Sequence, residues 1–357
     1  MTMPQRSLKI VHVGDFFSSL KKRSPSQFSV GGKLSNGLIR NGHHVINFAY
    51  RDIARAEGWF NSRYLGKRAL WRALKSFMET CRPDILLLGH GYMIPPEIIL
   101  DIRRAHPGLT TIQWNIDALF VEDNVRDFVA RHHVVDASFI STAGSLVREL
   151  IGHEGIVGFL PNPVDWSVER GRAHEHAHLE ADLFYACGNP ARLRRVCGRD
   201  WEMNEFCQEL EQHLPRSMKF SYAGVRGAPY YSGVDYAHLL EGTTMGLNIS
   251  RRADYFLYSS DRLAHMIGNG QLIHIERQTG YDHLFSDHEM SFFSSFDELV
   301  DNITRYHKAP QERQKVAEAG WRRYHELFNE RRVAEYIIHT ALGGESSQEF
   351  PWASCLS

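Results

Sequence analysis

Short apolar runs of strand length alternate with helical patterns along most of the chain, and this alternation limits the possible fold more than any other feature. The runs are rich in leucine and β-branched residues without polar alternation, which is typical of strands covered on both faces. Strands separated by helices form βαβ units and parallel sheets. The expected strands are residues 8–14, 43–50, 82–90, 109–117, 136–142, 155–162, 182–188, 218–224, 243–250, 271–276 and 289–295.

The alternation pauses once, at residues 161–182, where two prolines and dense charge interrupt any periodicity. A chain of 357 residues suits two domains. We therefore predict an α/β protein with two Rossmann-like domains facing across a cleft. The predicted parts are an N-terminal domain at 1–165, a linker at 166–181, a C-terminal domain at 182–328, a helix at 329–342 that is a candidate to pack back on the first domain, and a flexible tail at 343–357.

Composition excludes some functions and suggests a location. The 41 basic and 42 acidic residues nearly cancel, which argues against bulk nucleic-acid binding. The five cysteines are an odd number without paired spacing, which favours a reducing compartment. The start of the chain lacks an apolar signal segment, and no apolar run approaches the roughly 20 residues of a spanning helix. We expect a cytoplasmic protein, with peripheral contact at the inner membrane face left open.

The membrane alternative comes from residues 63–78, which hold five cations and no acid. A basic amphipathic helix with a tryptophan suits an anionic membrane or an acidic glycan. It also suits a solvated helix with one face in the core, and we favour that interpretation because the segment lies between two expected strands.

The stretch SSDRLAHMIGNGQLIH, residues 259–274, combines a short helical pattern with a glycine stop and a strand. Arg262 and His265 are three residues apart and share one helix face. Gly268 and Gly270 end the helix where left-handed backbone is needed. An arginine at a helix N-terminus suits a diphosphate, although an ordinary surface helix explains the same pattern.

Several motifs follow one another in a recognisable order. They are GLNISR (246–251), the block SSDRLAHMIGNGQLI (259–273), TGYDHLF (279–285), the helical run 296–328 and ERRVAEYII. Residues 246–341 thereby resemble the C-terminal domain of GT-B glycosyltransferases, in the branch related to spore-maturation-protein-like transferases. The first half resembles the N-terminal domain of that family more weakly, through LKIVHVG, VGGKLSNGLIRNGHHV, PDILLLGH and LPNPVD.

The resemblance implies transfer of a sugar from a nucleotide sugar, bound mainly by the C-terminal domain, to a glycan, lipid-linked or protein acceptor at the N-terminal domain. It implies that Arg262 faces the donor diphosphate. The family's two glutamates, eight residues apart, correspond to Leu257 and His265, so neither carboxylate is present. The nucleotide is then held differently, or donor chemistry is altered, or activity has decayed. The nucleotide sugar is a substrate, so no cofactor and no required metal are expected.

Further candidates for donor binding follow other expected strands. Gly188 and Asn189 would let backbone approach a phosphate, while Arg192, Arg194 and Arg195 would supply positive charge. At helical spacing Arg192 and Arg195 share one face, which a solvated basic helix explains equally well. Ser250 and Arg251 follow the GLNI strand.

In the first domain, Gly31 and Gly32 precede a helix, a position that suits a phosphate or an acceptor carboxylate. The glycine pair would also serve a simple turn.

Two residues after first-domain strands are candidate general bases, His90 and Asp117. Each also has a structural explanation, His90 as a core or capping histidine and Asp117 as a helix cap. If the enzyme retains configuration, both would only orient the sugar. The HEHAH run at 174–178 lacks a catalytic ligand set, and we do not predict a metal there.

Two other functions remain open. One is a nucleotide-sugar epimerase of the same architecture, and the other is a non-catalytic nucleotide-sugar-binding or assembly protein, which the missing glutamates suggest. A dehydrogenase is disfavoured because the first strand is not followed by G-x-G-x-x-G.

Overall fold

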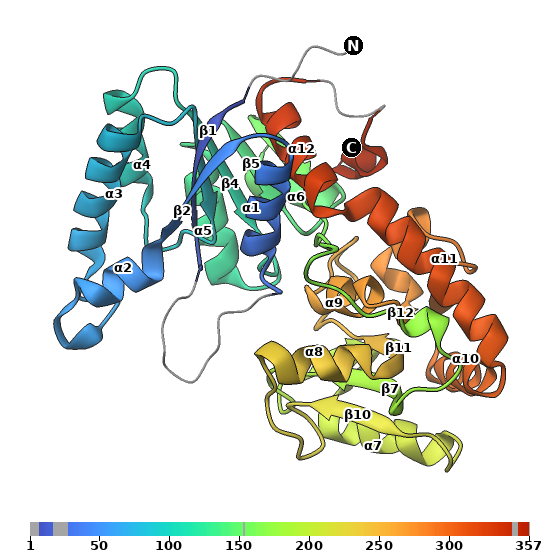
Figure 1. Ribbon diagram of the computed structural model, residues 1–357. Helices are drawn as coiled ribbons and strands as arrows, with labels where there is room; N and C mark the ends of the chain where they lie inside the picture. Colours follow the sequence, from blue (N-terminus) through green and yellow to red (C-terminus); the bar gives the residue numbers. More distant parts are fainter. Residues whose placement is uncertain (1–6, 17–27, 153, 345–348, 357) are drawn as a thin grey trace. The chain divides into compact units, whose positions relative to one another are not determined.

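The computed structural model describes residues 7–16, 28–152, 154–344 and 349–356. The chain divides into two compact units (Figure 1). The first unit comprises residues 1–163 and 330–357, and the second comprises residues 164–329. Each unit is built around its own parallel sheet.

The first unit contains a six-stranded sheet in the order β2-β1-β3-β4-β5-β6, and every neighbouring pair is parallel. Its strands are β1 (Lys9–Gly14), β2 (His44–Ala49), β3 (Ile85–Gly89), β4 (Thr110–Asn115), β5 (Ala137–Ile140) and β6 (Ile156–Phe159). Its helices are α1 (Val30–Arg40), α2 (Tyr50–Ala56), α3 (Lys67–Cys81), α4 (Pro96–Ala105), α5 (Glu122–His132), α6 (Ser145–Ile151) and α12 (Glu330–Ala341). β3 shows the expected continuous apolar run, because all five of its residues are buried.

Helix α12 packs against α1 of the first unit (Figure 1). Gly37 allows the two helices to approach closely, since a Cβ there would lie 2.0 Å from the carbonyl oxygen of Glu330. Arg40 forms an ion pair with Glu330, and Asn41 donates to the carbonyl of Arg331 at 2.8 Å.

The second unit contains a five-stranded parallel sheet in the order β10-β7-β11-β12-β13 and a separate antiparallel hairpin. Its strands are β7 (Ala181–Ala186), β8 (Arg194–Val196), β9 (Arg199–Trp201), β10 (Phe220–Ala223), β11 (Thr243–Asn248), β12 (Leu272–Glu276) and β13 (Ser291–Phe293). Its helices are α7 (Met203–His213), α8 (Gly233–Glu241), α9 (Arg262–Gly268), α10 (Phe296–Lys308) and α11 (Pro310–Phe328).

The predicted α/β class with parallel sheets is confirmed, and all the expected strands are present. The basic segment at 63–78 lies largely in α3, where Leu70, Leu74 and Met78 are buried in the core. In the described part of the chain, none of the helices combines the length and hydropathy needed to cross a bilayer.

Two irregular stretches are more ordered than the sequence suggests. The expected linker is part of the second unit, because Gly171 donates to the side chain of Asn269 at 2.8 Å and Ala173 donates to its carbonyl at 3.0 Å. The expectation of a flexible tail is wrong for residues 349–356. Phe350 and Trp352 are buried, with ring centroids 5.2 and 5.5 Å from that of Tyr336, so aromatic packing holds this segment.

Candidate functional site

His90 and Asp117 lie together at the carboxyl edge of the first sheet. His90 follows β3 and Asp117 follows β4, which are neighbours in the sheet. The Nδ1 atom of His90 lies 3.1 Å from Oδ2 of Asp117. The two candidate bases therefore form one pair, as expected where the carboxyl ends of parallel strands meet.

The backbone of His90 is held in an unusual conformation. Its φ of 48° lies in the left-handed region, which non-glycine residues seldom adopt. Its carbonyl accepts a hydrogen bond from the Tyr50 hydroxyl at 3.2 Å, and its amide donates to the carbonyl of Trp114 at 3.2 Å. Strained backbone of this kind persists where the surroundings fix it, and it is concentrated at functional sites.

Electrostatics favours the ionised form of Asp117. Burial raises the pKa of Asp117, but the hydrogen bond with His90 and the charges of His90, Arg51 and Arg131 outweigh it, so the pKa lies below its ordinary value. A carboxylate can only accept, so His90 must donate through Nδ1. Nε2 of the neutral ring is then a proton acceptor, which is the form required of a general base.

The sequence did not single out two charged residues at the same edge. Asp15 directly follows β1 and forms an ion pair with Arg51 at the start of α2. Burial raises the pKa of Asp15, despite the nearby charges of Arg51, Arg55 and His90. The guanidinium of Arg51 lies 5.1 Å from the ring centroid of Tyr92. Asp15 comes immediately after an expected strand, and this position in the sequence could have identified it as a candidate site residue.

The glycine pair lies inside a helix and not before it. Gly31 and Gly32 are in the first turn of α1, and the capping hydroxyl of Ser29 already accepts from the Gly32 amide at 3.2 Å. A Cβ at Gly31 would lie 3.4 Å from the Trp114 ring. The expectation that the pair precedes the helix is therefore corrected, and one of its two amides has a partner within the helix.

The second unit gathers arginines where β7 and β11 end. Arg194 of the hairpin donates to Sγ of Cys187 at 3.0 Å, one residue after β7. Arg262 donates to the carbonyl of Ile249 at 3.3 Å, one residue after β11. The backbone amide of Arg195 donates to the carbonyl of Arg251 at 3.2 Å, which joins the hairpin to the loop after β11.

Buried polar atoms at this edge lack partners within the described residues. They include both amide atoms of Asn248, the hydroxyl of Ser250, and Nε of Arg194 and Arg262. Asn248 and Ser250 are only 2% and 7% exposed. Because buried polar groups in proteins are nearly always paired, this cluster is a candidate binding site for a polar ligand or ordered water.

The cluster carries excess positive charge. Burial lowers the pKa of Arg251, and the nearby cations of Arg192 and Arg194 lower it further. Burial also opposes the charge of Arg194, but Tyr185 and Cys187 raise its pKa above the ordinary value. Like charges held this close favour an anionic ligand, because an anion relieves their mutual repulsion.

The helical spacing expected for Arg192 and Arg195 is wrong. Arg195 lies in β8 and pairs with Asp200 of β9, so Arg192 and Arg195 do not share a helix face. Arg192 and Asn189 are exposed in the turn before the hairpin. Gly188 has open space around its Cβ position, and its carbonyl accepts from the Tyr230 hydroxyl. Of the three arginines expected to supply charge, Arg194 is the one that the hairpin buries.

His265 and Gly270 have internal contacts. His265 is 5% exposed, with Nδ1 3.3 Å from the Tyr236 hydroxyl and Nε2 4.0 Å from Asp261. Gly270 has a φ of +80°, and a Cβ there would lie 2.5 Å from Nδ1 of His174. Leu257, at the other expected glutamate position, is fully buried with a φ of 56°.

No group of three histidine, cysteine, aspartate or glutamate side chains within the described residues is arranged to hold a metal ion. In the HEHAH run, His174 is buried and its ring lies 4.6 Å from that of Trp321, whereas His176 and His178 are exposed. These contacts explain His174 by packing.

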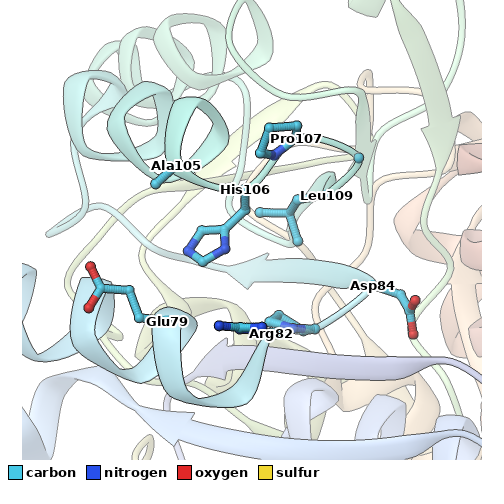
Figure 2. A pocket seen from close by; sticks show the side chains of 9 residues that line it. Glu79, Arg82, Asp84, Ala105, His106, Pro107 and Leu109 are labelled. Atoms are coloured by element: carbon cyan, nitrogen blue, oxygen red, sulfur yellow. The ribbon is translucent and has the colours of Figure 1, made fainter.

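A separate polar cavity of about 520 Å³ lies at the opposite edge of the first sheet. Its lining comes from the segments that lead into β3 and β4, and Figure 2 shows Glu79, Arg82 and His106 around it, with Asp84 pointing away. Ligands of open parallel sheets bind at the carboxyl ends of strands. This cavity is therefore not part of either candidate site.

A family model described as glycosyl transferase-like matches residues 190–339. No curated protein sequence matches the chain.

Similar solved structures cover nearly the whole chain at low identity. HepE of Anabaena, in complex with UDP-glucose, is 9% identical with a TM-score of 0.59, covering 93% of this chain and 99% of its own. AviGT4, a glycosyltransferase of avilamycin A biosynthesis, is 15% identical with a TM-score of 0.56, and the match covers 94% of this chain and 97% of AviGT4. A UDP-N-acetylglucosamine 2-epimerase, so described provisionally, from Listeria monocytogenes is 10% identical with a TM-score of 0.51, covering 96% and 97%. The fold is that of GT-B glycosyltransferases.

Proposed function

We propose that this chain is a glycosyltransferase that moves a sugar from a nucleotide-sugar donor to a hydroxyl group of an acceptor. The observation that carries the proposal is the cluster of buried arginines and unpartnered polar side chains at the carboxyl ends of β7 and β11. The family match over residues 190–339 includes this cluster from Arg194 to Arg262. The UDP-glucose complex of the structurally similar HepE supports a nucleotide-sugar donor.

The proposed donor site recognises the diphosphate through side chains. Guanidinium groups of Arg194, Arg251 and Arg262 would donate charge-assisted hydrogen bonds to phosphate oxygens. Asn248 and Ser250 would complete the polar lining. Helix α9 has only seven residues, so the arginines and not its dipole would provide most of the attraction. These cations would also stabilise the departing diphosphate without a metal ion.

The proposed acceptor site is the His90–Asp117 pair of the first unit. Nε2 of His90 would take the proton from the acceptor hydroxyl as that oxygen bonds to the anomeric carbon and the diphosphate leaves. Asp117 would orient the ring and stabilise the imidazolium that forms. This scheme inverts configuration. In a retaining enzyme the pair would orient the sugar instead. The acceptor is proposed to be a glycan, a lipid-linked saccharide or a protein.

Neither of the two glutamates of the family is present, so the ribose would have to be held by other groups. Leu257 and His265 are buried, and His265 contacts Tyr236 and Asp261, so we propose that ribose recognition falls to other residues of the second unit. Membership of the spore-maturation-protein-like branch remains part of the proposal. The five cysteines are all unpaired, which supports a reducing, cytoplasmic location.

Two alternatives have specific support. The fold is shared with the Listeria protein described as an epimerase, and the missing glutamates suggest a binding protein without turnover. Calorimetry with UDP, GDP, CMP and dTDP sugars, followed by product analysis with and without acceptors, separates the three. A transferase releases nucleotide faster when its acceptor is present. An epimerase converts the donor without acceptor, and a binding protein leaves it unchanged.

A further inference from the structure

The turn between α2 and α3 has several large apolar side chains exposed to solvent. Phe60 is 93% exposed, which is the largest value for any large apolar side chain within the described residues. Tyr64 and Leu65 are 61% and 62% exposed. Three large apolar side chains thus face solvent within six residues, whereas isolated exposed residues of this kind are ordinary.

The backbone of this turn has a specific conformation, with two residues in the left-handed region and two closely packed glycines. Phe60 and Asn61 both have a φ of 57°. Gly58 and Gly66 permit close backbone packing, because a Cβ would lie 2.1 Å from the Ser62 carbonyl oxygen and 1.8 Å from that of Ala54, respectively. The turn joins α2 to α3 (Figure 1), and its close backbone packing leaves the side chain of Phe60 exposed.

Positive charge surrounds these apolar side chains. From residue 58 to residue 78 the sequence has five cations and no acid. Arg68 and Arg72, four residues apart on α3, are exposed and form no ion pair with any described residue. Lys67 lies 5.8 Å and Arg63 4.9 Å from the ring centroid of Tyr64, so cations and aromatic side chains share one surface.

The apolar face of α3 is not available for an external partner. Leu70, Leu74 and Met78 are buried in the core, and Trp71 donates through Nε1 to the carbonyl of Met93 at 2.7 Å. Lys75 is paired with Asp101. Any contact must therefore use the preceding turn and the outer face of the first α3 turns, and not the amphipathic helix that the sequence suggested.

We propose that this surface, formed by Phe60, Tyr64, Leu65, Arg68 and Arg72, docks the first unit on a phospholipid bilayer with anionic headgroups. A projecting apolar turn enters the interface without needing a matching groove, and aromatic rings are well suited to the headgroup level. Uncompensated cations beside it are attracted to anionic lipid. The inference rests on this turn alone and does not depend on the proposed sugar transfer.

The turn lies on the same side of the first unit as the candidate acceptor site. α2 begins directly after β2 at the carboxyl edge of the sheet, and Arg51 in its first turn is paired with Asp15 of that site. Arg63 of the turn interacts electrostatically with Arg51 and with Tyr92. A docked bilayer would therefore lie close to the residues around His90.

The test is flotation of the full chain with vesicles of phosphatidylcholine alone and with vesicles rich in phosphatidylglycerol, without any donor. We expect binding only to the anionic vesicles, weakened by salt. Phe60→Asn with Leu65→Ser should weaken binding about tenfold or more, and Asn suits the left-handed backbone at residue 60. Arg68→Gln with Arg72→Gln should also weaken it more than tenfold, at about fivefold per charge.

Matched controls are Leu100→Ser, an exposed apolar residue of α4, and Arg126→Gln, an exposed cation of α5. Both should bind vesicles as the unmodified chain does. The proposal is overturned by an absence of binding to anionic vesicles, or by binding that both double variants leave intact. A concentration-dependent dimer that Phe60→Asn abolishes, without vesicle binding, would assign the surface to a second copy of the chain and would also overturn it.

Discussion

Nδ1 of His90 lies 3.1 Å from Oδ2 of Asp117, although the two residues are 27 positions apart in the chain. The contact exists because β3 and β4 are parallel neighbours, so the residues that follow them meet at one edge. The ionised carboxylate fixes which ring nitrogen of His90 carries the proton.

Replacement of His90 by Gln should reduce turnover by roughly 100-fold to 10,000-fold, the range for loss of a general base. Asp117→Asn should also slow turnover, because the amide no longer favours the Nδ1–H tautomer. Steady-state rates and donor affinity should be measured together, and donor affinity should not change. Asp123→Asn, an exposed residue of α5, is the control. Full turnover in His90→Gln would remove the pair from the chemistry.

Two glycines of the second unit should differ in how much stability the protein loses when each is replaced by alanine. At Gly270 the positive φ and the contact with His174 leave no room for a Cβ, so Gly270→Ala should lower the free energy of unfolding by about 1–3 kcal/mol. At Gly188 the Cβ position is open, so Gly188→Ala should change the free energy of unfolding by less than about 0.5 kcal/mol. Thermal melting of both variants checks this, and equal losses would contradict the described packing.

Stability should fall in mildly acidic solution. Burial lowers the pKa of His12 and of His274 from the ordinary 6.5 to about 3. Between these values the unfolded chain binds a proton on each ring that the folded chain does not. Stability is therefore full above about pH 6.5 and falls by up to about 1.4 kcal/mol per pH unit per histidine as pH drops toward 3.

Urea unfolding at about pH 7 and about pH 5 measures this dependence. The variant His274→Gln keeps a polar side chain near Ser291 but removes one titrating group, so its pH dependence should be shallower. An equally steep loss in that variant would show that His274 is not responsible.

The sequence predicted the sheets well because the strands are buried on both faces. In β3 every residue is buried, and its sequence is a continuous apolar run that no helical face explains. The sequence did not predict the β8–β9 hairpin, because Arg194–Val196 and Arg199–Trp201 are too short and too polar to show a strand pattern. The arginines there were assigned a helical spacing that the hairpin does not have.

The candidate sites were predicted as separate residues and not as assemblies. His90 and Asp117 were singled out by their positions after strands, but their pairing depends on sheet order, which one sequence does not state. Asn248 was missed because its importance lies in buried side-chain atoms without partners among the described residues. The packed segment around Trp352 was missed because its contact with Tyr336 of α12 is a tertiary contact, which no local sequence pattern shows.

The central claim is that the arginines at the ends of β7 and β11 hold the diphosphate of a nucleotide sugar. Titration calorimetry of the UDP, GDP, CMP and dTDP sugars with the unmodified chain, Arg262→Ala and Arg194→Ala tests it most directly. Arg226→Ala, an exposed arginine paired with Glu211 in the same unit, is the control. We predict that at least one donor binds, and that each cluster variant weakens it by about 1.5–3 kcal/mol, or roughly 10-fold to 150-fold, while the control does not. Binding of no donor, or unchanged affinity in both cluster variants, would contradict the account.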